Sequence, residues 1–149
     1  MGFWVTNHLA NPILRPLLRS RAGRRLGRHL AVLRYRGRRT GRQHELVVQY
    51  ARDGDAVWVL PGQADRKTWW RNFAEPRDIE VWLAGENMHA RGVTLDGHLQ
   101  PGDVGRGLAA YLQQLPRARK APGVAAEGDL SEVAARTVLV RIDLESDSV

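Results

Sequence analysis

Short runs of alternating apolar and polar residues, each ended by a glycine-containing turn, constrain the fold of this chain more than any other feature. Residues 31–36 and 45–52 flank the segment Gly37-Arg-Arg-Thr-Gly41, and Asp53-Gly-Asp55 then leads into residues 57–60. Turns this tight connect antiparallel strands, because parallel strands need a crossover of a dozen residues or more. The pattern therefore predicts a meander of three antiparallel strands. Two glycines permit positive φ in its basic first loop.

The rest of the chain adds further strands and a few helices. Residues 79–83 and 88–95 predict a second hairpin around Gly85-Glu-Asn, and residues 137–144 a last strand. Apolar residues recur at helical spacing over 103–115, and shorter helices are expected over 66–74 and 129–135. About six mostly antiparallel strands with short helices predict a mainly β (α+β) fold, a closed or half-closed β-barrel forming one domain over residues 1–149.

Positive charge is concentrated in the first third of the chain. Eleven arginines and no acidic residue precede Glu45, whereas 12 lysines and arginines face 16 acidic residues from there onward. Residues 1–29 predict a basic amphipathic helical segment, ahead of the barrel over 30–149. This asymmetry calls for an anionic partner, either a phosphate-bearing ligand or an anionic membrane surface. Nucleic acid is not expected, because residues 15–28 carry no aromatic side chain for base stacking.

Several classes of protein are excluded by composition and spacing. The chain has no cysteine, so disulfides and thiolate zinc sites are absent, and its five histidines lack the spacing of a metal site. Its apolar runs are far shorter than the ~20 residues that span a bilayer. We expect a cytoplasmic protein without a secretory signal, with attachment to the inner membrane face as an alternative.

The basic loop between the first two strands is the strongest candidate for a binding site. Glycine-bounded backbone N–H groups, a threonine hydroxyl and two arginines in one short loop are what a phosphate or a polycarboxylate requires. A solvated basic turn would have the same sequence. Both interpretations remain open on these residues alone.

The order of several motifs identifies a family. Gly-Arg-Arg-Thr-Gly, a strand with Tyr50, Asp-Gly-Asp, a further strand and Trp-Trp-Arg-Asn follow one another over about residues 30–95. This order resembles the deazaflavin-dependent nitroreductase or quinone reductase family, whose members use coenzyme F-420. The resemblance implies a split β-barrel, similar to the flavin-binding pyridoxamine-phosphate-oxidase-like proteins.

The same resemblance implies a set of cofactor-binding residues. In the family a basic loop grips the cofactor phosphate, a basic residue follows on the next strand, a Pro-Leu pair lies against the deazaflavin ring, and a small-residue loop and an aromatic helix complete the site. The matching positions here are Arg38, Arg39, Thr40, Gly41, His44, Val47, Val48, Leu60, Pro61, Gly62, Gln63, Arg66, Lys67, Trp69, Trp70 and Asn72. His44 and the Val47-Val48 pair depart from the family pattern.

Three aromatic residues have two interpretations each. Trp69 and Trp70 fit either core packing or the wall of a cofactor site, and adjacent helical positions cannot both face one way. Tyr111, on the helix predicted over 103–115, is a candidate proton donor by resemblance to the family, or a ring packed on the barrel.

The resemblance implies an oxidoreductase that passes a hydride from C5 of reduced F-420 to an electron-poor small molecule. Quinones, nitroaromatics and enones are the expected acceptors, and a homodimer is expected by analogy. Two alternatives remain open. One is a non-catalytic protein of the same fold that holds FMN, haem or a fatty acid, and the other is a membrane-surface protein that binds anionic lipid through its N-terminal segment.

Overall fold

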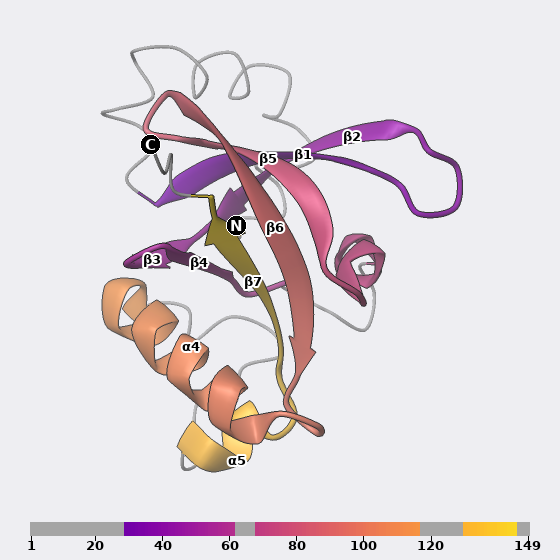
Figure 1. Ribbon diagram of the computed structural model, residues 1–149. Helices are drawn as coiled ribbons and strands as arrows, with labels where there is room; N and C mark the ends of the chain where they lie inside the picture. Colours follow the sequence, from indigo (N-terminus) through magenta and orange to yellow (C-terminus); the bar gives the residue numbers. More distant parts are fainter. Residues whose placement is uncertain (1–28, 62–67, 117–129, 146–149) are drawn as a thin grey trace, which may run out of the picture. The chain divides into compact units, whose positions relative to one another are not determined.

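Figure 1 shows the computed structural model, which describes residues 29–61, 68–116 and 130–145. The strands are β1 (Leu30–Arg36), β2 (Gln43–Gln49), β3 (Ala51–Asp53), β4 (Ala56–Val59), β5 (Arg77–Leu83), β6 (Glu86–Asp96) and β7 (Val138–Leu144). The helices are the 3₁₀ helix η2 (Trp69–Phe73), α4 (Pro101–Gln114) and α5 (Leu130–Ala134). The strands form one sheet in the order β2-β1-β5-β6-β7-β4-β3. This confirms the predicted mainly β, split-barrel fold class.

The predicted three-strand meander is wrong at its second strand. Residues 45–52 divide at Tyr50 into β2, which pairs with β1, and β3, which pairs with β4. These two strands stand at opposite ends of the strand order, although Tyr50 alone separates them in sequence. An alternating run carries no signal for a change of partner halfway along. The consequence is a barrel-like connectivity, in which the covalent chain joins the first strand of the sheet to the last.

The chain divides into two compact units that interleave in sequence. Unit 1 comprises residues 1–50, 78–91 and 144–149, and unit 2 comprises residues 51–77 and 92–143. Strand β6 contributes its first part to unit 1 and its second part to unit 2. Most of the predicted basic segment 1–29 lies outside the described residues.

The core of unit 1 is a row of side chains across β2, β1 and β5. Val32 is the cross-strand partner of both Val47 and Trp82, and the three residues form a buried cluster against which Leu30 packs. Side chains at these positions share one face of the sheet, because cross-strand partners point the same way. The hairpin β1–β2 is thereby anchored at its open end, and its closed end carries the basic loop.

The core of unit 2 forms where α4 packs against strands β3 and β4. Trp58 of β4 lies in one cluster with Val104, Leu108 and residues of α5 and β7. Gly107 makes this packing possible, because a Cβ atom there would overlap the Trp58 ring. Helix α4 was predicted over 103–115 and begins two residues earlier, since proline is well suited to the first helical turn.

Turn geometry and the short helix differ in detail from the prediction. Ala84 and Gly85 both have positive φ, so the β5–β6 turn is formed by residues 84 and 85, one residue before the predicted turn. The helix predicted over 66–74 is, in its described part, the 3₁₀ helix η2. Its bonds Arg71 N to Thr68 O and Ala74 N to Arg71 O each span three residues.

Within the three described ranges, no helix has both the length and the apolar character needed to span a bilayer.

Candidate functional site

Two backbone hydrogen bonds hold the loop at the closed end of the β1–β2 hairpin. Gly37 N donates to Arg42 O at 2.8 Å, and Gly41 N donates to Gly37 O at 2.9 Å. Gly41 has a φ of 68°, a left-handed conformation that glycine adopts without steric cost. Thr40 Oγ1 accepts a bond from Arg42 N at 3.2 Å, and a hydroxyl that accepts one bond keeps its own proton to donate. The loop is thus a fixed frame that carries a hydroxyl donor.

Gly37 forms the floor of a small cradle beside this loop. A Cβ atom placed on Gly37 would lie 3.1 Å from Nε2 of His44 and 3.3 Å from Oγ1 of Thr40. Positive φ was permitted by sequence at both loop glycines, and of the two Gly41 adopts it and Gly37 does not. Glycine at position 37 therefore provides space rather than an unusual conformation. We call the space above Gly37, bordered by the His44 nitrogen and the Thr40 hydroxyl, the Gly37 cradle.

Tyr35 positions His44 at the edge of the cradle. The two residues are cross-strand partners on β1 and β2, and their rings stack with centroids 5.5 Å apart and planes inclined by 30°. Tyr35 is buried, and this burial raises the pKa of its phenol to about 12, so the ring stays neutral at physiological pH. His44 is exposed, yet its imidazole has a defined position against Tyr35 with Nε2 beside Gly37.

Arginine side chains surround the loop. Arg36, Arg38, Arg39 and Arg42 are all exposed, and no acidic residue occurs between positions 36 and 44. Arg36 Nη1 donates to Gly41 O at 3.3 Å, which ties one of these side chains to the loop. Guanidinium groups keep their charge at any physiological pH and match the geometry of phosphate oxygens. The loop therefore combines permanent positive charge with the cradle's hydrogen-bonding atoms.

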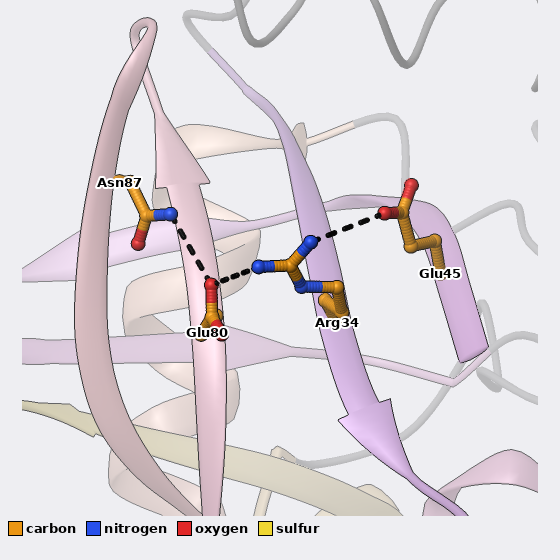
Figure 2. Close-up of polar contacts among 4 residues, drawn as sticks. All are labelled: Arg34, Glu45, Glu80 and Asn87. Atoms are coloured by element: carbon orange, nitrogen blue, oxygen red, sulfur yellow. Dashed lines mark hydrogen bonds and ion pairs between the residues drawn. The ribbon is translucent and has the colours of Figure 1, made fainter. Parts of the chain in front are cut away.

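Arg34, one step before the loop on the other face of β1, has a different role. Figure 2 shows its guanidinium between two carboxylates, with Nη2 2.6 Å from Glu80 Oε2 and Nη1 3.9 Å from Glu45 Oε1. Asn87 Nδ2 donates to the same Glu80 oxygen at 3.2 Å, and the Arg34 guanidinium carbon lies 4.8 Å from the Trp82 ring centroid. Arg34 thus holds a structural ladder across four strands.

The Glu80 carboxylate is stabilised in its charged form by this ladder. Burial alone would raise the pKa of Glu80, but the hydrogen bonds from Asn87 and Arg34, together with the positive charges of Arg34 and His89, outweigh it and lower the pKa. Arg34 and Glu45 are cross-strand partners one position along from Tyr35 and His44, so they point to the opposite face of the sheet. The carboxylates nearest the loop are therefore engaged with Arg34 rather than with the cradle.

Val47 and Val48 continue β2 away from the loop. Val47 is completely buried in the unit 1 core row, and Val48, on the other face, is 4% exposed. Protein atoms cover both side chains here, and their contact with a deazaflavin ring stays a prediction.

The remaining predicted cofactor residues that the structure describes belong to unit 2. Trp69 and Trp70 are partly exposed; Trp69 meets Phe73 edge-on at 6.4 Å. Asn72 Nδ2 donates to Trp69 O at 2.8 Å, which stabilises η2 itself. Thr94 Oγ1 donates to Trp70 O at 2.6 Å and fastens the helix to β6.

The segment after β4 is described only at its beginning. Leu60 packs against the unit 2 core, and Pro61 is buried. The predicted residues Gly62, Gln63, Arg66 and Lys67 lie outside the described residues. The structure thus gathers the phosphate-loop candidates in unit 1 and the tryptophans, Asn72, Leu60 and Pro61 in unit 2.

Tyr111 lies in the core of unit 2 with 3% of its surface exposed. Burial raises the pKa of its phenol well above the ordinary value of about 10, which disfavours the phenolate left after proton donation. This position favours the packing interpretation, and proton donation by Tyr111 stays a prediction.

Two residues of the candidate site were not identified from the sequence. Tyr35 was seen only as part of the basic motif, and Gly37 only as a turn residue. Counting outward from the loop along the hairpin would have paired Tyr35 with His44, because cross-strand partners are fixed by the turn. In the described ranges, no three His, Asp or Glu side chains gather in a way that could hold a metal ion.

Comparisons with solved structures support the fold. An F420-H2-dependent reductase, FDR-A, superposes with a TM-score of 0.56 at 12% identity, over 79% of this chain and 95% of that one. A protein described as a domain-swapped dimer gives 0.54 at 11% identity, over 89% and 99% of the two chains. A haem-binding protein from Mycobacterium smegmatis gives 0.49 at 15% identity, over 84% and 48%, a likeness too low to bear on ligands.

Comparisons of sequence address the family directly. No curated protein sequence matches the chain at a significant level. The model of the family described as F420H(2)-dependent quinone reductase matches residues 15–101, more than half of the chain. This range includes the basic loop, the Gly37 cradle and η2, the features on which the resemblance rested. The chain therefore belongs to the F420H2-dependent quinone reductase family.

Proposed function

We propose that this protein binds coenzyme F-420 and, with the cofactor reduced, reduces an electron-poor small molecule. The observation that carries the proposal is the Gly37 cradle, a space that one methyl group would fill, inside the family's basic loop. An imidazole nitrogen and a hydroxyl border it, and arginines surround it. These are donors suited to the phosphate of F-420, so the residues present fit the cofactor.

The residues of the loop would hold the phosphate and thereby orient the cofactor. Arg38 and Arg39 supply permanent positive charge, Thr40 a hydroxyl donor, and His44 an imidazole nitrogen at the edge of the cradle. Gly41 keeps the loop in the turn that presents these groups. The tight backbone bonds of the loop mean that little ordering is needed on binding, which favours affinity.

Reduced F-420 supplies a hydride at C5, so the protein's own contribution is binding, orientation and fixed charge. Under this proposal Val47, Val48, Leu60 and Pro61 provide apolar surface, and Trp69 and Trp70 provide partly exposed aromatic surface for a flat ring. No side chain of the described ranges is required as a general acid, general base or nucleophile. Quinones, nitroaromatics and enones are the acceptors we propose, in keeping with the family description.

Titration of the purified protein with oxidised F-420, followed by fluorescence, tests the binding step. We expect saturable binding at micromolar cofactor, and its absence would overturn the proposal. Oxidation of reduced F-420 is then measured with a soluble quinone. Binding without turnover over a panel of quinones, nitroaromatics and enones would favour a non-catalytic carrier. Displacement of F-420 by FMN at lower concentration would favour a flavin protein.

Arg39→Ala tests the phosphate assignment. Loss of one exposed cation from the loop should weaken F-420 binding, and the difference from wild type should shrink as salt is added. Arg136→Ala is the matched control, since it removes the same exposed charge from unit 2. Equal affinity of Arg39→Ala and wild type at low salt would contradict the assignment.

Two partner proposals rest on the sequence rather than on the described residues. The arginines between positions 15 and 28 support contact with an anionic membrane surface, which flotation of the full chain with phosphatidylglycerol vesicles tests. A homodimer is proposed by analogy with split-barrel proteins, and its test is the mass in solution.

A further inference from the structure

His44 differs from every other charged group around the Gly37 cradle in that its charge changes near neutral pH. Histidine gains or loses its proton between about pH 5 and 8, whereas guanidinium groups remain charged throughout. The charged groups of the loop are Arg36, Arg38, Arg39 and Arg42. On β1 the facing titratable group is Tyr35, which stays neutral because burial raises its pKa to about 12.

Acidic groups near His44 are turned away from it. Glu45, its neighbour on β2, lies on the opposite face of the sheet beside Arg34, and Arg34 also engages Glu80 on β5. Among the described residues that pack around the cradle, nothing else would compensate a change in the charge of His44. A proton on His44 therefore adds directly to the positive potential at the cradle.

The imidazole also has a defined place there. Its ring stacks on Tyr35, and its Nε2 lies 3.1 Å from the point that a Cβ on Gly37 would occupy. A phosphate oxygen in the cradle would meet that nitrogen at hydrogen-bond distance. The protonated ring donates to such an oxygen with its charge, whereas the neutral ring donates only in one of its two tautomers.

We propose that His44 makes cofactor binding by this protein dependent on pH, its protonated imidazole being an additional cationic ligand of the bound phosphate. This inference rests on the proposed function and states how its site is regulated. The sign follows from linkage. A phosphate that prefers protonated His44 binds more tightly as the pH falls through the titration of His44, and it raises the pKa of His44 by the same factor.

The magnitude is limited by solvent, because His44 is exposed. An exposed, charge-assisted contact changes affinity by about three- to tenfold, less than a buried one would. Four nearby arginines disfavour a further positive charge on the free loop, and a bound anion offsets that repulsion.

Calorimetric titration with oxidised F-420 at about pH 5.5 and about pH 8 tests the inference. Wild type should bind about three- to tenfold more tightly at the lower pH. His44→Lys should bind tightly at both pH values and His44→Gln weakly at both. His98→Gln is the matched control: it removes another exposed histidine, paired with Asp96 in unit 2, and should keep the wild-type pH dependence.

The outcomes separate the two levels of the proposal. Any titration of the cofactor itself is common to all four proteins, so it cancels when their affinity ratios are compared. If wild type and His44→Gln show the same ratio, His44 is not a ligand of the phosphate, although F-420 binding stands. If no variant binds F-420, the proposed function fails. A second readout is NMR of the imidazole: saturation with F-420 should raise the pKa of His44, and an unchanged pKa would overturn the inference.

Discussion

Replacing Gly37 by alanine fills the cradle without disturbing the turn that forms it. The new Cβ would lie 3.1 Å from His44 Nε2, 3.3 Å from Thr40 Oγ1 and 3.4 Å from His44 Cδ2. These contacts require shifts of a few tenths of an ångström, which the two side chains can make. The φ of Gly37 lies outside the left-handed region, and alanine lowers the entropy of the unfolded chain by an amount worth about 0.4–1 kcal/mol. Stability should therefore change by less than about 1 kcal/mol.

Cofactor affinity should respond much more strongly than stability. A methyl group in the cradle keeps a phosphate away from both His44 Nε2 and Thr40 Oγ1. Each hydrogen bond is worth about 1 kcal/mol, so the loss of two predicts about 30-fold weaker binding of F-420.

Gly41→Ala is the matched comparison in the same loop. A Cβ at Gly41 meets no atom within 4 Å, but its φ of 68° costs a non-glycine residue about 1–2 kcal/mol. Gly41→Ala should thus lower the free energy of unfolding and lose less affinity than Gly37→Ala. Denaturant unfolding and F-420 titration of both variants measure the contrast. Wild-type affinity in a folded Gly37→Ala protein would refute the placement of the phosphate in the cradle.

Three further predictions concern the framework around the site. Gly107→Ala should destabilise the protein by about 2 kcal/mol in denaturant unfolding, because the added methyl overlaps the Trp58 ring and this outweighs the gain of about 1 kcal/mol in helix propensity; a stabilised variant would show that α4 packs differently. Gln114→Ala removes two hydrogen bonds, of 3.2 and 2.8 Å, that its side chain makes to the backbone of β3, and should cost about 1 kcal/mol of unfolding free energy, with faster amide exchange in β3; unchanged exchange would count against it. Because the pKa of Glu80 is lowered in the folded state, its charge stabilises the protein above the ordinary glutamate pKa of about 4.3, and this contribution is lost as the pH falls through the folded-state value; Glu80→Gln should flatten that part of the stability–pH curve, and an identical slope would contradict the ladder of Arg34.

The strands and turns could be predicted because each is specified locally. Alternating apolar residues and glycine turns at Gly54 and Gly85 placed the strands within a few residues of their observed bounds. The division of one predicted strand at Tyr50 could not be predicted in this way. Which strand pairs with β3 is decided by packing between segments far apart in sequence, and β4 and β7, its neighbours in the sheet, are themselves about 80 residues apart.

The candidate site was predictable where residue type alone carries the chemistry. The arginines and the hydroxyl of the basic loop indicated an anion site before any geometry was known. The space above Gly37 and the stacking of His44 on Tyr35 depend on hairpin register, so they required the structure. The burial of Tyr111 likewise depends on which face of α4 meets the sheet, and the helical period gives the face but not its surroundings.

The most direct test of the central claim is a map of backbone amide shifts in ¹⁵N-labelled full-length protein as oxidised F-420 is added. Binding at the Gly37 cradle predicts the largest changes at the amides of residues 37–44, and Gly37→Ala should abolish them while leaving the spectrum of the free protein folded. Saturable binding with shifts confined to other residues, or the same loop shifts in Gly37→Ala, would contradict the account.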